Sequence, residues 1–156
     1  MLHKDYFKCN IGILVEEMVE VITARLRASN YNCQLIGFGL GYNKYITGGF
    51  YHSIKLPAPT CNPEEIIKIC NQMIEKYYDN EPIRKIMISL GKLSQNNDLQ
   101  LNLFDDYEKN INSLKLNKSV DNIKNKFGKN SIVKASALLP DSTIMERNGK
   151  IGGHHE

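Results

Sequence analysis

The chain has 156 residues, 42% of them hydrophobic and 24% charged, which fits one compact domain with a tail. Its formal net charge of +3 does not by itself argue for a nucleic-acid partner. No apolar run is long enough to cross a membrane, no signal peptide is evident, and the four cysteines lack zinc-site spacing. We therefore expect a cytoplasmic protein with reduced thiols.

The first third of the chain predicts a strand followed by an amphipathic helix. The segment "LHKDYF" alternates like a strand directly after Met1, so we expect the chain to be part of a longer one, cut at a domain edge. From Ile11 to Arg27, apolar residues recur at three- and four-residue steps, with Glu16, Glu17 and Glu20 on the other face. The apolar stripe consists of Ile11, Leu14, Val15, Met18, Val21, Ile22 and Leu26.

Residues 34–42 predict a strand with one large apolar face and one bare face. In "QLIGFGLGY", Ile36, Phe38 and Leu40 alternate with glycines. Glycines on one face of a strand usually mean that another group approaches the backbone closely. That group is either a ligand or a helix or loop packed against the face.

The next segments predict a second strand, a helix and a last strand. Residues 50–56 alternate as a strand that "PAPT" ends. Asn62 as N-cap, Pro63 at the first helical position and two following glutamates predict a helix over 62–78. The segment "IRKIMISLGKL", residues 83–93, alternates again and predicts the last strand.

The element order predicts an α+β fold of the βαββαβ type. A four-stranded antiparallel sheet carries two helices on one face, because each helix has one apolar side to bury. The opposite, open face then has lysines but no acid, which suits a nucleic-acid backbone as well as it suits plain solvent exposure. The predicted open face consists of Leu35, Gly37, Gly39, Gly41, Tyr51, Ser53, Lys55, Lys85, Met87 and Ser89.

The chain changes character after Leu93, so we expect a domain over 1–93 and a tail over 94–156. The tail is polar, yet "QLNLF" at residues 100–104 is strongly apolar, which indicates either a segment folded back on the domain or a docking peptide. Residues 118–128 predict a short amphipathic helix ended by Gly128, and "SIVKASALL" predicts a strand before a flexible end.

Several segments resemble the C-terminal region of Y-family translesion DNA polymerases of the UmuC-like, ImpB/MucB/SamB type. The resemblance runs in order through "LIGFGLGYNK", "GGFYHSIKLPAPT", "QLNLF", "FGKNSI" and "RNGKIGGHH". It implies a little-finger domain in a reversed ferredoxin-like arrangement, whose open face grips the backbone of primer–template DNA. It also implies a role in DNA repair and the SOS response. By position, the DNA-contacting residues are Lys44, Tyr51, His52, Ser53, Lys55, Arg84, Lys85 and Ser89.

The box "QLNLF" resembles the motif that tethers bacterial polymerases to the sliding clamp. The resemblance implies that Gln100 bonds the rim of a clamp pocket, that Leu103 and Phe104 fill it, and that Leu101 and Asn102 complete the box. The resemblance places the carboxylates that hold Mg²⁺ in the palm domain of such polymerases, outside this chain. We therefore expect no cofactor, no metal site and no catalytic residue here, with palm, fingers and thumb as partners.

Two alternative functions remain open at the level of the sequence. The first is an RNA-binding sheet module, although such modules stack bases on exposed aromatics and Tyr51 is the open face's only one. The second is a non-catalytic protein that occupies the clamp and excludes other polymerases.

Overall fold

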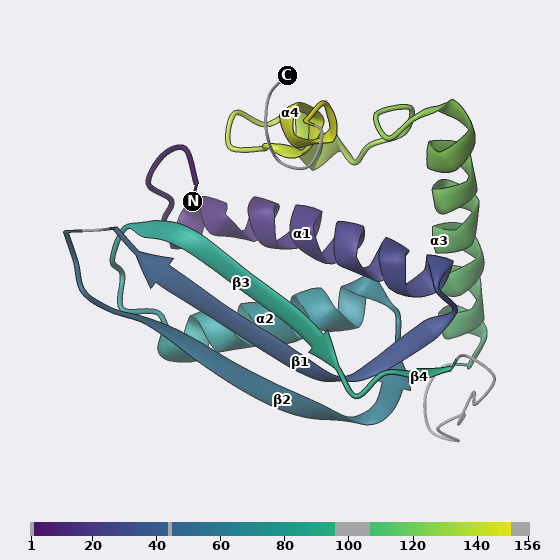
Figure 1. Ribbon diagram of the computed structural model, residues 1–156, viewed down its shortest axis with the longest axis horizontal. Helices are drawn as coiled ribbons and strands as arrows, with labels where there is room; N and C mark the ends of the chain where they lie inside the picture. The colour runs from purple at the N-terminus through teal and green to yellow at the C-terminus, as the bar shows by residue number, and fades with distance from the viewer. Residues whose placement is uncertain (1, 44, 96–106, 151–156) are drawn as a thin grey trace. The chain divides into compact units, whose positions relative to one another are not determined.

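The computed structural model describes residues 2–43, 45–95 and 107–150, apart from the side chains of 107–110. The chain forms two compact units, residues 1–102 and 103–156. Each unit is described by itself below. The first unit holds the sheet and two helices (Figure 1).

Three long antiparallel strands form the sheet of the first unit. They are β1 (Tyr31–Tyr42), β2 (Gly49–Thr60) and β3 (Ile83–Gly91), in the order β2-β1-β3. A fourth, two-residue strand, β4 (Ser94–Gln95), pairs with the start of β1. The predicted α+β class with a four-stranded antiparallel sheet is therefore confirmed.

Two helices bury the apolar face of the sheet. Helix α1 (Lys8–Ala28) and helix α2 (Pro63–Tyr77) pack on each other and on the strands, and α2 crosses behind the sheet in Figure 1. From Ile36 to Tyr42, every second residue of β1 contributes to this core, as the alternation predicts, because side chains of a strand point to opposite faces. The fully buried core side chains include Ile11, Leu14, Val15, Val19, Ile36, Phe38, Leu40, Ile66 and Met73.

The burial pattern of α1 departs from the prediction. Glu17, which the sequence places on the polar face, is only 6% exposed, and Val19 and Thr23 are buried as well. Met18 and Ile22, expected in the core, are half-buried. The contacts of α1 with α2 as well as with the sheet explain this shift, because a helix packed on two neighbours buries a wider arc than one stripe.

Two strands differ from their predicted form. The N-terminal segment forms a single bridge, Tyr6 with Ile83, instead of a full strand, and β4 supplies the fourth strand. Strand β2 runs on to Thr60 through Pro57 and Pro59, where the sequence predicted a break. Among the described strands, β2 pairs with β1 alone, and the free side of an edge strand tolerates proline because no ladder hydrogen bond is lost there.

The second unit is helical. Helix α3 (Tyr107–Phe127) contains the predicted helix but begins earlier, and α4 (Ile144–Asn148) is one short turn. The predicted strand over 131–139 is wrong: the residues form a loop and a 3-10 turn, Ala135–Leu138. The described part of this unit offers the segment no strand to pair with, and a lone strand leaves its backbone groups unsatisfied.

Candidate nucleic-acid interface

The strand register places the predicted open face on one side of the sheet. Gly37 of β1 is flanked by Ser53 of β2 and Ser89 of β3. Gly39 is flanked in the same way by Tyr51 and Met87. Leu35 pairs with Lys55, and Gly41 pairs with Lys85, at the two ends of the face. Ile36, Phe38 and Leu40 point to the helices. The alternate residues of β1 and their partners on β2 and β3 therefore lie on the opposite, open face.

Tyr51 is the group that approaches the glycines of β1. A Cβ atom built on Gly39 would lie 2.9 Å from Tyr51 Cδ2, and one built on Gly37 would collide with the Tyr51 hydroxyl. That hydroxyl lies 2.7 Å from the hydroxyl of Ser89. The side chain thus starts on β2, crosses the central strand and reaches β3. The two glycines make room for an aromatic side chain on the same face of the sheet. The sequence predicted a ligand, a helix or a loop at this place, and not a side chain of the sheet itself.

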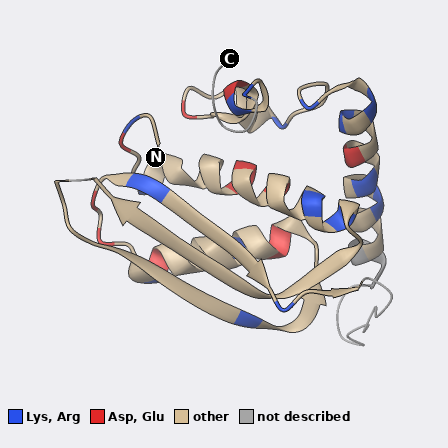
Figure 2. Ribbon diagram, in the orientation of Figure 1, with Lys and Arg blue, Asp and Glu red and all other residues tan. Residues whose placement is uncertain are grey.

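The acidic residues of the first unit lie outside its three long strands. Strands β1, β2 and β3 contain no Asp or Glu, and their cations are Lys55, Arg84 and Lys85. The acids lie on the helices and loops, as the red segments of Figure 2 show. The side chains of Lys55 and Lys85 are exposed on the open face. Such a face attracts anions, because no carboxylate on it offsets the lysines.

One expected DNA-contacting residue points to the other side of the sheet, and another is not described by the structure. His52 pairs with the buried Phe38 and stacks on Tyr77 of α2, with ring centroids 3.9 Å apart, so it points to the helix side. Lys44 lies outside the described residues. The open face therefore brings together Tyr51, Ser53, Lys55, Lys85 and Ser89.

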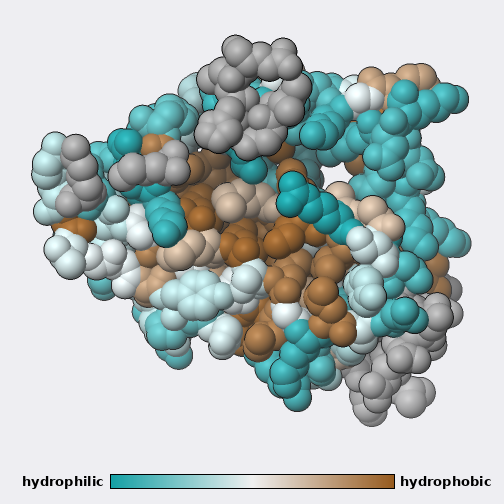
Figure 3. Space-filling model, in the orientation of Figure 1, coloured by the Kyte–Doolittle hydropathy of each residue, from teal (hydrophilic) through white to brown (hydrophobic). Residues whose placement is uncertain are grey.

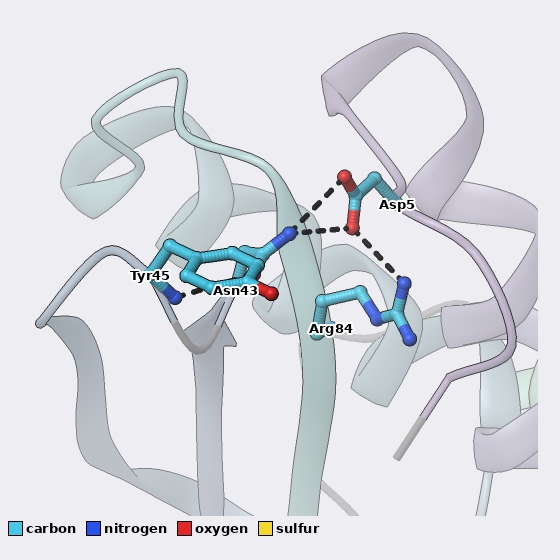
Figure 4. A network of polar contacts seen from close by, with 4 residues as sticks. All are labelled: Asp5, Asn43, Tyr45 and Arg84. Carbon is cyan, nitrogen blue, oxygen red and sulfur yellow. Dashed lines mark hydrogen bonds and ion pairs between the residues drawn. The ribbon is translucent and has the colours of Figure 1, made fainter.

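Arg84 belongs to a polar network at the start of β3. Its guanidinium donates to Asp5 over 3.2 Å, and the amide of Asn43 donates to the two oxygens of the same carboxylate over 3.2 and 3.3 Å (Figure 4). The backbone of Tyr45 in turn donates to the side-chain oxygen of Asn43. The network joins the N-terminal segment to the ends of β1 and β3, so Arg84 has a structural contact where the sequence suggested only a phosphate contact.

The clamp motif is the remaining predicted site. Residues 100–104, the expected clamp motif, lie outside the described residues. Within residues 2–43, 45–95 and 107–150, no three His, Cys, Asp or Glu side chains gather as a metal site. In the same described ranges, no helix combines the length and apolarity that a bilayer crossing requires.

The fold and the composition of the open face define the class of this protein. It is an α+β domain whose sheet has one uncovered face and no acidic residue in its strands. The chain belongs to the ImpB/MucB/SamB family, because the model of that family's C-terminal domain matches residues 9–103. It is the C-terminal domain of a Y-family DNA polymerase. The chain is 30% identical to "DNA polymerase IV 2" of Bacillus subtilis over 99% of its length, which is 38% of that relative. It is 31% identical to the "putative UV-damage repair protein UvrX" of the same bacterium, covering 99% of the chain and 37% of the relative.

A more distant relative shows the same partial coverage. "DNA polymerase IV" of Pelotomaculum thermopropionicum is 26% identical over 96% of the chain and 36% of the relative. The chain therefore spans less than two fifths of the length of these three relatives.

Proposed function

We propose that the first unit binds the sugar–phosphate backbone of DNA, without sequence specificity, through its open face. The observation that carries this proposal is the absence of acid from the three long strands, whose face exposes Lys55 and Lys85. Phosphate contacts supply nearly all of non-specific DNA affinity, and lysine side chains are among the groups that make them. The relatives' names support DNA as the partner, because they include DNA polymerase IV.

Within a longer polymerase, this unit would hold primer–template DNA while a palm domain with bound Mg²⁺ performs the transfer. The role of this chain would be to hold the DNA and to position it for the palm domain. Residues 1–93 would form the DNA-holding little finger, and residues 94–156 the tail. The protein would act in the cytoplasm. It would act during repair or bypass of damaged DNA, a process that the name of the UvrX relative supports.

The test compares charge removal on the open face with the same charge removal on the helices. Lys55→Ala with Lys85→Ala removes the two exposed lysines of the open face, and Lys68→Ala with Lys76→Ala removes two from α2. Each phosphate contact contributes roughly 0.9 to the slope of log K against log salt. We expect the open-face variant to bind a duplex oligonucleotide more weakly, with the slope reduced by about 2, and the α2 variant to match the wild type.

An equal loss of affinity in both variants would show that net charge, not this face, governs binding. Arg84 is left intact in the test because its contact with Asp5 is part of the fold. Its removal would mix a stability effect with a binding effect.

We propose further that residues 100–104 tether the chain to the bacterial sliding clamp. Support comes from the sequence "QLNLF" and from its place in the chain between β4 and α3. Three large apolar side chains in a polar segment suit a peptide whose anchors enter a pocket of another protein.

A further inference from the structure

Tyr51 occupies the centre of the open face in a way that leaves its ring available. The residue is 51% exposed, although Gly37 and Gly39 beneath it are buried. One side of the side chain therefore rests on the backbone of β1 and the other is turned to solvent. A side chain with any Cβ beneath it could not lie this close to the strand.

The hydroxyl of Tyr51 is already bonded within the protein. It lies 2.7 Å from the Ser89 hydroxyl, and that bond fixes the far end of the side chain on β3. A tyrosine held at both ends loses little conformational freedom when a ligand arrives. The exposed aromatic surface, rather than the hydroxyl, is then what Tyr51 offers to a ligand.

The side chains around Tyr51 on the open face are uncharged, and the cations lie at the two ends of the face. Met87 lies across from Gly39 in the same row as Tyr51, and Leu35 lies nearer Lys55. Both are half-buried. Figure 3 shows apolar side chains in the middle of the view beside paler, more polar ones. Lys55 and Lys85 lie toward opposite ends of β1, opposite Leu35 and Gly41. An aromatic, uncharged centre between cations matches a flat base between phosphates better than it matches a duplex backbone.

We infer that the open face binds single-stranded DNA, with one unpaired base stacked on Tyr51 and phosphates farther along the strand near Lys55 and Lys85. This inference rests on the proposed function, since it gives the DNA-binding face a preferred substrate. A duplex keeps its bases inside the stack and offers this face only phosphates, whereas a single strand offers both groups. Stacking on one aromatic is tolerant of sequence, because every base has a flat face.

The experiment uses the full chain with two 12-nucleotide probes of equal charge. One is an oligothymidylate, and the other is a fully abasic strand with the same phosphates. We expect the wild type to bind the oligothymidylate roughly tenfold more tightly, as expected for one stacked base. We expect Tyr51→Leu, which keeps an apolar side chain without a ring, to remove that difference and keep the affinity for the abasic strand.

Two further variants separate stacking from structure. Tyr45→Leu is the matched control, because Tyr45 is 83% exposed but lies in the turn after β1 rather than on the sheet. We expect it to retain the full preference for bases. Tyr51→Phe loses the bond to Ser89 but keeps the ring, and we expect it to retain most of the preference.

The outcomes distinguish this inference from the proposed function. Equal binding of both probes by the wild type overturns the inference even if Tyr51→Leu fails to fold, and leaves backbone binding standing. A preference that survives in a folded Tyr51→Leu variant also overturns it. Failure of the wild type to bind either probe or a duplex overturns the proposed function itself. A strong preference for RNA over DNA of the same bases would exclude a DNA strand as the intended ligand.

Discussion

Four residues on three strands depend on one another at the centre of the open face. Tyr51 can lie across β1 because Gly37 and Gly39 lack side chains, and Ser89 fixes its hydroxyl. The sequence predicted a close approach to these glycines, since bare positions alternate with large apolar ones. It could not name the approaching group, because that depends on the register between strands that are distant in the chain.

The first prediction concerns glycine replacement under Tyr51. A methyl group on Gly39 would press on the backbone oxygen of Phe50 and lie 3.0 Å from Tyr51 Cα, so backbone must shift to admit it. We expect Gly39→Ala to lower the free energy of unfolding by about 2 kcal/mol, measured by urea denaturation. Gly12→Ala is the control: it lies in α1 with open space around it, and should raise stability by about 0.5–1 kcal/mol.

The second prediction concerns the buried thiol of Cys70. Burial raises the pKa of Cys70 from 9.0 to about 12, so the native state holds its proton after the unfolded chain has lost it. The stabilising effect is complete below pH 9 and is lost as pH rises toward 12, at up to about 1.4 kcal/mol per pH unit. Cys33, whose pKa burial raises to about 11, acts in the same direction.

Urea denaturation between pH 8 and 10.5 tests this effect. We expect Cys70→Ala to be less stable than the wild type at pH 8 but to lose less stability as pH rises, because one proton-retaining thiol is gone. Cys9 is exposed, so Cys9→Ala should keep the wild-type slope. Parallel slopes for all three proteins would contradict the role of Cys70.

At the scale of elements, segments with local signals were predicted best. Helix α2 was expected over 62–78 and is observed at Pro63–Tyr77, because its N-cap, its first proline and its apolar stripe all agree. The tail strand failed for the opposite reason. Its only signal was composition, and a strand forms only where another strand pairs with it. The fourth strand, β4, has two residues and no pattern that could reveal it.

The third prediction concerns the N-cap of α2. The Asn62 side chain accepts a hydrogen bond of 3.0 Å from the Glu64 amide, one of the backbone donors that the first helical turn leaves free. We expect Asn62→Ala to lower stability by about 1 kcal/mol in thermal or urea unfolding. Asn71→Ala changes an exposed asparagine inside the same helix and should have no such effect. Equal losses in the two variants would mean that the cap is unimportant.

At the scale of the whole molecule, the sequence predicted the α+β class and the open face but not the full set of contacts on it. Lys55 and Lys85 were placed by strand alternation alone. Arg84 and His52 were assigned through the resemblance, yet the structure pairs one with Asp5 and stacks the other on Tyr77. Alternation gives the face of a side chain in a regular strand, but contacts made across the fold require the packed structure.

The last prediction concerns the separate roles of the sheet unit and the tail. If Leu103 and Phe104 are clamp anchors, Leu103→Ala with Phe104→Ala should abolish binding to an immobilised bacterial sliding clamp, because two large side chains would leave its pocket. The melting temperature should stay within about 2 °C of the wild type, since anchors directed at a partner contribute little to the chain's own core.

The matched control replaces the same two residue types elsewhere in the tail. Leu116 and Phe127 of α3 are each 66% exposed, so Leu116→Ala with Phe127→Ala removes similar apolar surface at another place. We expect this variant to bind the clamp normally and to keep its open-face DNA affinity. A large drop in melting temperature for the Leu103 and Phe104 variant alone would instead show that residues 100–104 fold back on the domain. In that case the apolar segment stabilises the chain itself, and clamp tethering must be sought elsewhere.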